Sequence, residues 1–470
     1  MRVLFVYPVP PPRFQILRYQ QGIGSISAVL KKGGHSTSLL YLWQGDDDAL
    51  DRSVCEFRPD LVALSLTSGF FEFGCAVAKQ VKERYSLPVL LGGVHPTLCP
   101  EESIAADGVF AICVGEGEYP TLELCDALAA GRDPTKIANL WVRRDGTVHR
   151  NEMRPLITDL DSLPFPDRDI FPVEELLKTL PEAEFMGSRG CPYLCAYCVN
   201  HALIELYKGK GPYVRYRSVD NLLVEVAQVI ARYPAIRLLG FHDDTFTLNE
   251  KWLGEFSEKY AARFPLKFWC NSTAGMINEK TVAMLKEAGC YEVRIGLESG
   301  NDHIRMDVLR KKVARGEIIN AFRLIRKAGM DAYAFNMIGL PGETPATIED
   351  TIRLNRIVRP RVVFCSVFQP YPGTQLHELC IEKGWYTGKA VKSYFENEYA
   401  LRQPTITARQ VLYYHDIFVA LVKWPWAGGV IRLMANIPVT RNKTLWNAFR
   451  RFKIKVKEFR ELLSKLVKRE

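Results

Sequence analysis

The chain has 470 residues, of which 47% are apolar, 24% charged and 11% aromatic. This length suggests two or three domains, and the composition excludes a disordered chain, a collagen and a coiled coil. Its twelve cysteines are too few for a secreted disulfide framework of this size. No apolar run reaches the ~18 residues of a membrane span, and Met1–Tyr7 is typical of a strand rather than a signal peptide. We expect a soluble or peripheral cytoplasmic protein.

The net charge of +9 is concentrated near the C-terminus. Residues 441–470 hold eleven lysines and arginines against three glutamates, a net +8 of that total. The rest of the chain is therefore close to neutral, and the basic excess belongs to one segment.

Residues 1–150 alternate short apolar strands with segments of helical spacing. The predicted strands are Val3–Tyr7, Ser38–Leu42, Leu61–Leu66, Val89–Leu91 and Phe110–Val114. Gly74–Tyr85 and Thr121–Ala130 are examples of the helical segments between them. Buried strands that alternate with helices predict a parallel sheet covered on both faces. We therefore predict an α/β, doubly wound (Rossmann-like) N-terminal domain.

Residues 151–182 are rich in proline and lose apolar periodicity, which predicts a linker. Strand–helix alternation resumes over 183–390. The strands predicted there are Glu184–Ser188, Arg237–Phe241, Lys267–Trp269, Glu292–Leu297, Ala332–Ile338 and Val362–Phe368. Six such units predict a partial or complete βα (TIM-like) barrel, with its chemistry at the carboxyl ends of the strands. Residues 391–470 are predicted to be a separate, helical and basic extension.

The strongest chemical signal is a three-cysteine motif directly after the first barrel strand. Cys191, Cys195 and Cys198 form a C-x3-C-x2-C pattern. Three thiolates this close can hold a [4Fe–4S] cluster and leave its fourth iron open to a substrate's amino and carboxylate groups. The alternative is a Cys3His zinc site completed by His201. Zinc motifs usually come as two CxxC pairs, so we favour the cluster.

With an aromatic residue before its last cysteine, this motif resembles that of the radical S-adenosylmethionine (SAM) enzymes. The resemblance extends to three downstream segments, Phe241–Phe246, Ile295–Gly300 and Ile338–Thr344. It implies a [4Fe–4S] cluster and a SAM site formed by Tyr197, Asp243, Asp244, Glu298, Ile338 and Gly339. For Asp244, a role as a helix N-cap or turn residue is an open alternative.

The N-terminal domain resembles the cobalamin-binding domain of B12-dependent radical SAM enzymes. The matching segments, 64–68, 91–96 and 115–118, follow the third, fourth and fifth predicted strands. Glycines there let the backbone approach a ligand closely, and hydroxyls can bind it. The implied cobalamin-binding residues are Ser65, Thr67, Gly92, Gly93, Gly115, Glu116 and Gly117.

No histidine stands in the loop after the first strand, where cobalamin mutases carry their cobalt ligand. His35 precedes the second strand, and His95 follows the fourth. Neither lies in a ligand motif, so we expect cobalamin to bind without a protein histidine on cobalt.

Over about residues 1–390 the order of domains and motifs resembles that of anaerobic Mg-protoporphyrin ester cyclases and hopanoid methylases. The resemblance implies that the reduced cluster cleaves SAM, and that the resulting radical and methylcobalamin act on an unactivated carbon. C-methylation of a small-molecule or lipid-like substrate is the expected reaction, with an electron donor such as flavodoxin or ferredoxin. Ring formation or rearrangement without methyl transfer is the alternative. Outside enzymes, a non-catalytic cobalamin or iron–sulfur binder is possible.

No nucleic-acid partner is expected, because the chain carries no nucleic-acid fold signature and no second three-cysteine motif of a tRNA methylthiotransferase. Residues 444–467 place aromatic and aliphatic side chains at helical spacing, with cations between them. Such a helix suits an anionic membrane surface, and it can equally pack on the barrel with a solvated basic face. Peripheral contact of 441–470 with the inner membrane surface is therefore one of two open predictions.

Overall fold

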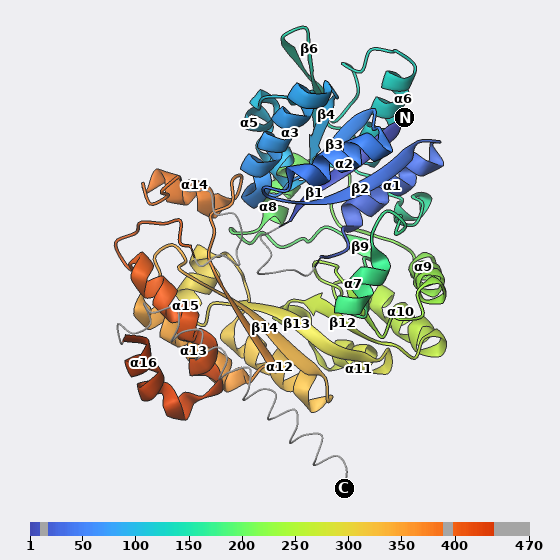
Figure 1. Ribbon diagram of the computed structural model, residues 1–470. Coiled ribbons are helices and arrows are strands. Elements are labelled where there is room, and N and C mark those ends of the chain that lie inside the picture. The colour runs from blue at the N-terminus through green and yellow to red at the C-terminus, as the bar shows by residue number, and fades with distance from the viewer. Residues whose placement is uncertain (10–16, 389–397, 437–470) are drawn as a thin grey trace.

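The computed structural model describes residues 1–9, 17–388 and 398–436 (Figure 1). The first part of the chain forms a seven-stranded sheet of order β2-β1-β3-β4-β5-β6-β7. Its first five strands are parallel: β1 Arg2–Val9, β2 Ser36–Trp43, β3 Leu61–Ser65, β4 Val89–Gly92 and β5 Ala111–Cys113. These are the predicted strands, with ends shifted by at most two residues. The strand order reverses between β1 and β3, which is where open α/β sheets bind ligands.

Helices cover both faces of this sheet. They are α1 Gln21–Lys32 and α6 Glu118–Ala129 on one face, with α2 Asp47–Phe57, α3 Phe71–Tyr85, α4 Val94–Leu98 and α5 Pro100–Ala105 following the other strands. Alternate residues of β1 enter different cores: Val3 and Phe5 pack with Leu30 of α1, whereas Leu4 packs with Val54 of α2. Because successive strand side chains point to opposite faces, both faces must be covered. The predicted doubly wound domain is confirmed.

A hairpin that the sequence analysis missed closes one edge of the sheet. Strands β6 Leu140–Arg144 and β7 Thr147–Arg150 are antiparallel, and β6 pairs with β5. Asp145 and Gly146 between them both have positive φ, 49° and 75°, as a type I′ turn requires. The Asp-Gly pair was the available signal for this hairpin.

The predicted linker is more ordered than expected, since 151–182 contains helix α7 Val173–Thr179 and a 3-10 turn at Leu160–Ser162. Phe171 packs into the core of the N-terminal domain, and Leu177 packs into the core of the barrel. The segment 151–182 therefore packs against both the N-terminal domain and the barrel.

The second sheet has six parallel strands in the order β15-β14-β13-β12-β11-β8, which is an open, partial barrel. The strands are β8 Glu182–Phe185, β11 Leu238–Phe241, β12 Lys267–Ser272, β13 Cys290–Glu298, β14 Asp331–Ile338 and β15 Val362–Val367. The accompanying helices are α8 Val199–Leu206, α9 Val219–Arg232, α10 Glu250–Arg263, α11 Glu279–Glu287, α12 Arg315–Lys327, α13 Pro345–Val358 and α14 Gln375–Glu382. A small antiparallel ribbon, β9 Ser188–Arg189 with β10 Arg215–Tyr216, lies beside the sheet.

Local sequence explains where these helices begin. The side chains that accept a backbone hydrogen bond at the N-caps of α9, α10, α11 and α13 are Ser218, Asn249, Asn278 and Thr344. Such residues satisfy N–H groups that the first turn leaves free.

Part of the predicted separate extension belongs to the barrel instead. Helix α15 Ala408–Lys423 buries Val411, Phe418 and Leu421 in one cluster with Ile338 of β14, and α16 Gly428–Asn436 packs on α15. The apolar stripe of α15 packs against the edge strand β15 and helix α13. The basic segment 441–470 lies outside the described residues, so both readings of it stay predictions. Among the residues described, no helix is long and apolar enough to cross a membrane.

Candidate active site

The three cysteines lie on the loop between β9 and α8. Gly190 opens this loop with φ +89°, and a Cβ there would stand 2.5 Å from the Tyr213 carbonyl oxygen. Glycine is therefore required at the turn into the loop. The Cys198 N–H donates to the Cys195 carbonyl at 3.0 Å, which folds the second half of the motif into a tight turn.

The arrangement of the thiols fits a cluster better than a single zinc ion. Zn–S bonds of about 2.3 Å in a tetrahedral site put the sulfurs about 3.8 Å apart. Among the described residues, however, Cys191, Cys195 and Cys198 do not belong to any group of three ligand atoms lying within 4.8 Å of one another, and neither does His201. Cysteine thiolates are the donors that hold Fe–S clusters, and one loop brings three of them together, so the residues present fit a [4Fe–4S] cluster.

Burial raises the pKa of all three thiols, and that of Cys198 reaches about 11. Iron must therefore displace thiol protons when it binds, as metals do at cysteine sites. At Cys195 the neighbouring Lys311 ammonium acts against burial and favours the thiolate. Sequence reasoning missed Lys311, which stands in a basic run after β13 with no motif to mark it.

Two residues of the predicted SAM site meet beside the cysteine loop. The Tyr197 hydroxyl donates to Glu298 Oε1 at 3.2 Å, and Lys311 Nζ lies 3.5 Å from the same oxygen. Glu298 ends β13 at a bulge and has φ +63°, a strained conformation for a side-chain-bearing residue. A Cβ at Gly296 would collide with both the Glu298 carboxylate and Lys311 Nζ. The bulge and the glycine thus aim a buried, ion-paired carboxylate at the loop.

The two aspartates after β11 have different environments. Asp243 is buried and accepts hydrogen bonds from Gly187 N–H at 3.1 Å and Ser188 Oγ at 2.5 Å, and burial raises its pKa to about 6. It therefore holds the chain that leads into the cysteine loop. Asp244 lies in a turn rather than at an N-cap, and accepts from Asn200 Nδ2 at 3.2 Å. That amide also lies 3.7 Å from Cys198 Sγ. Direct contact of either aspartate with SAM stays a prediction.

The turn after β14 is organised by a buried carboxyl group that sequence reasoning did not single out. Ile338 is fully buried and Gly339 has φ +79°. The N–H groups of Gly339 and Leu340 donate to Glu343 Oε2 at 2.6 and 3.2 Å, whereas Glu343 Oε1 has no partner. Glu343 is 0% exposed, and burial raises its pKa to about 8. A protonated carboxyl group therefore braces this turn at neutral pH.

The predicted cobalamin residues after β3 and β4 lie together at the carboxyl edge of the first sheet. Gly93 has φ +97°, and a Cβ there would stand 2.7–2.8 Å from the Leu66 backbone. A Cβ on Gly92 would meet nothing closer than Cys113 Cβ at 3.9 Å. Gly93 is therefore required by the fold, whereas Gly92 leaves space that a ligand can use. Ser65 and Thr67 border this edge at the end of β3.

The residues after β5 face the barrel. Gly115 has φ +94° and donates its N–H to Thr97 Oγ1 at 3.0 Å, and a Cβ there would collide with the Tyr207 hydroxyl. The Glu116 N–H donates to that hydroxyl at 2.8 Å. A Cβ on Gly117 would lie 2.9 Å from Ile26 Cδ1 of α1. The structure thus brings these three residues to the contact between the domains, and cobalamin binding by them stays a prediction.

Both candidate histidines lie close to polar groups of the protein. His35 Nδ1 lies 2.9 Å from the Met1 amine and its Nε2 lies 3.0 Å from Asp126 Oδ1. His95 Nδ1 lies 3.1 Å from Ser68 Oγ, and burial lowers the pKa of its ring to about 4. His35 lies in the connection between α1 and β2, and cobalamin binding without a protein histidine on cobalt stays a prediction.

The fold and site define an iron–sulfur enzyme whose barrel is paired with a doubly wound ligand-binding domain. The model of the Radical SAM superfamily matches residues 186–354, and that of the B12 binding domain matches residues 19–125. An uncharacterized methyltransferase of Pyrococcus horikoshii, PH0819, is 31% identical over 332 residues, 70% of this chain and 71% of that protein. The anaerobic magnesium-protoporphyrin IX monomethyl ester cyclase of Rubrivivax gelatinosus is 24% identical over 80% of this chain and 70% of its own length.

Among solved structures, the radical SAM methyltransferase TsrM of Kitasatospora setae, with cobalamin and a [4Fe–4S] cluster bound, has a TM-score of 0.68 and 18% identity. The match covers 81% of this chain and 78% of that one, which supports the fold. The chain belongs to the cobalamin-dependent radical SAM enzymes. Its cofactors are a [4Fe–4S] cluster, SAM and cobalamin, and the family and cofactor predictions are confirmed.

Proposed function

We propose that the protein transfers a methyl group to an unactivated carbon of a small organic or lipid-like molecule. The observation that carries this proposal is the direct contact between the two cofactor regions. The loop after β5 hydrogen-bonds through Glu116 N–H to Tyr207, which follows the helix behind the cysteine loop. When bound, the cluster with SAM supplies hydrogen abstraction, and cobalamin supplies a methyl group.

The chain's own residues prepare this site. The Glu298–Lys311 pair offers a carboxylate and a cation beside Cys195, the residue types that bind the hydroxyls and carboxylate of a ligand such as SAM. Asp243 and Glu343 hold the two turns that frame the strand ends.

Ring formation without methyl transfer is a second candidate, since one relative is named a cyclase. The test is anaerobic incubation of the reconstituted enzyme with methyl-labelled SAM, a low-potential flavodoxin or ferredoxin, and small-molecule and lipid extracts. Mass analysis should find the label on carbon of a product. 5′-Deoxyadenosine with an unlabelled product would instead support cyclisation or rearrangement.

The matched controls are Cys195→Ala and Cys55→Ala. Cys195 is in the cluster motif, whereas Cys55 is exposed on α2. Cys195→Ala should form no product, and Cys55→Ala should behave like the parent enzyme. Labelled product from Cys195→Ala would contradict a cluster-dependent reaction.

A further inference from the structure

We infer that Arg189 and Arg215 of the barrel, with Glu116 and Glu118 of the N-terminal domain, form a charged clamp that sets the position of cobalamin relative to the cluster. The role of this clamp in methyl transfer rests on the proposed function, whereas the ion pairs that form it do not depend on which reaction the enzyme catalyses. These four are positioning residues, because they act through the loops that they join.

The clamp is built from two facing strands and one loop. Arg189 and Arg215 are directly paired in the β9–β10 ribbon. Arg189 Nη1 donates to Glu116 Oε1 at 2.9 Å, and its Nη2 donates to Glu118 Oε1 at 2.6 Å. Arg215 Nη1 donates to the same Glu116 oxygen at 2.8 Å. One planar guanidinium group thus bridges two carboxylates of the other domain, a task suited to its forked geometry.

Neighbouring groups add further hydrogen bonds to both carboxylates. Glu116 Oε2 accepts from the Ile157 N–H at 2.9 Å, and Arg215 donates to the Ile157 carbonyl at 2.8 Å. Ser25 Oγ of α1 donates to Glu118 Oε1 at 2.9 Å. Three segments therefore meet here: the N-terminal domain, the segment after it and the barrel ribbon.

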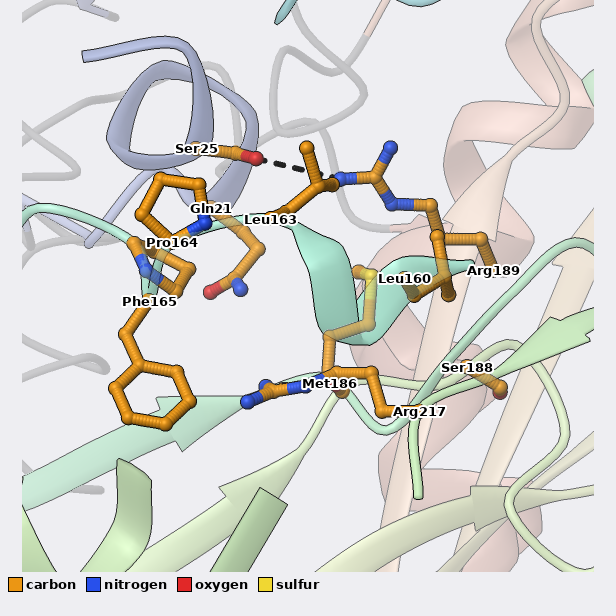
Figure 2. A pocket seen from close by; sticks show the side chains of 11 residues that line it. Gln21, Ser25, Leu160, Leu163, Pro164, Phe165, Met186, Ser188, Arg189 and Arg217 are labelled. Atoms are coloured by element: carbon orange, nitrogen blue, oxygen red, sulfur yellow. Dashed lines mark hydrogen bonds between the residues drawn. The ribbon is translucent and has the colours of Figure 1, made fainter. Parts of the chain in front are cut away.

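The ion pairs are withdrawn from water. The side chains of Glu118 and Arg215 are each 5% exposed, and that of Glu116 is 15% exposed. Burial alone raises the pKa of Glu118, but the Arg189 guanidinium outweighs it and holds the pKa below its usual value. Figure 2 shows Arg189 and Ser25 at the wall of a cavity of about 40 Å³. The two guanidinium groups and the two carboxylates lie within ion-pairing distance, so their charges compensate one another.

The clamp grips both ends of the cysteine loop. Only Gly190 separates Arg189 from Cys191, and Tyr207, just beyond α8, accepts a hydrogen bond from the Glu116 N–H. The segment from 189 to 207, which carries all three cluster cysteines, is thus tied at each end to the loop after β5. A shift of that loop must move the cluster segment with it.

The test measures the distance between the two cofactors in the anaerobic holoenzyme, without substrate. Paramagnetic cobalamin and the reduced cluster interact through a dipolar coupling that falls steeply with distance, and electron paramagnetic resonance detects it. Arg189→Gln and Glu118→Gln should each lose this coupling while keeping iron and cobalamin stoichiometry. Arg189→Lys keeps the charge but not the fork, so it should retain part of the coupling. Asp60→Asn, which breaks an exposed ion pair with Arg2, should leave the coupling unchanged.

The double variant Arg189→Gln/Glu118→Gln separates positioning from stability, because it leaves neither of these charges buried without its partner. If the single variants fail to fold, the double variant should fold and lack the coupling. Faster proteolysis within 151–182 should accompany the loss. Unchanged dipolar coupling in a folded, cofactor-loaded variant would overturn the clamp, whatever reaction the enzyme catalyses. If the variants lose the dipolar coupling but the parent enzyme forms no methyl-labelled product, the clamp stands and only the proposed methylation is overturned.

Discussion

The two domains differ in the residues that stand at the carboxyl ends of their strands. In the barrel, buried carboxyl groups stand there, and each is held by hydrogen bonds: Asp243, Glu298 and Glu343. In the N-terminal domain the corresponding loops carry glycines, of which Gly93 and Gly115 have positive φ. Buried carboxyl groups therefore predominate at the strand ends of the barrel, whereas closely packed glycines predominate in the loops after β4 and β5, where the Glu116 and Glu118 carboxylates reach across to the barrel. Removing side-chain atoms should therefore disrupt the barrel site, whereas adding side-chain atoms at the glycines should disrupt the ligand site of the N-terminal domain.

The largest effect is expected at the cysteine loop. Cys191→Ala, Cys195→Ala and Cys198→Ala should each lose the cluster, because two thiolates cannot hold it, and SAM cleavage should disappear. Iron and sulfide analysis, with 5′-deoxyadenosine as the readout of cleavage, checks this. Stoichiometric zinc with no iron in anaerobically prepared parent protein would contradict the cluster.

Adding a side chain at Gly92 should abolish cobalamin binding. A Cβ at Gly92 would make only ordinary van der Waals contact, with Cys113 Cβ at 3.9 Å and the Leu64 carbonyl oxygen at 4.0 Å. Gly92→Leu should therefore lower the melting temperature less than a backbone clash does, keep the cluster and lose cobalamin absorbance after gel filtration. Gly93→Ala meets the Leu66 backbone and has an unfavourable φ, so it should lower the melting temperature as well. Equal effects of the two variants on the melting temperature would contradict this division.

Lys311→Met should weaken SAM binding without removing the cluster. It leaves the Glu298 carboxylate buried without its cation, which costs about 3 kcal/mol. We expect a rise of about tenfold or more in the Kd for SAM, equivalent to at least about 1.4 kcal/mol. Equilibrium binding to the reconstituted enzyme measures it. Lys312→Met is the matched control, because Lys312 is exposed. Equal Kd values for the two variants would argue against a role for Lys311.

Glu343→Gln should flatten the dependence of stability on pH. The folded-state pKa of about 8 lies above the ordinary value of 4.5, so the folded protein binds this proton more tightly. Its contribution to the free energy of unfolding is therefore full below pH 4.5 and is lost as the pH rises through about 8. Melting temperatures of the anaerobic holoenzyme from acid to alkaline pH check this. Glu382→Gln, at an exposed site, should keep the parent slope.

The smallest effect concerns the basic segment 441–470. Each cation near an anionic surface contributes roughly 1 kcal/mol, so the full chain should co-sediment with anionic vesicles. The fraction that sediments should be smaller with neutral vesicles and at high salt. A chain shortened to residue 436 should stay in solution. If both chains sediment equally, the segment does not bind the membrane, and the interpretation as a helix packed on the barrel remains.

Much of the fold and part of the site could be predicted from local sequence. The parallel strands followed from apolar runs, and cysteine spacing predicts the cluster ligands, because one loop supplies all three thiols. The hairpin β6–β7 carried a readable turn at Asp145–Gly146 that was overlooked. Helix α15 was placed outside the barrel because its apolar stripe does not say which surface it covers.

Tertiary structure alone decided the partners of the functional groups. Lys311 meets Glu298 and Arg189 meets Glu118 across 13 and 71 residues, and no local pattern marks either pair. Residue type and spacing determine which chemistry a loop can perform, since ligand atoms in one loop need only local geometry. Charge pairing, burial and the pKa values that follow from them depend on which distant segments the two folded sheets bring within hydrogen-bonding distance.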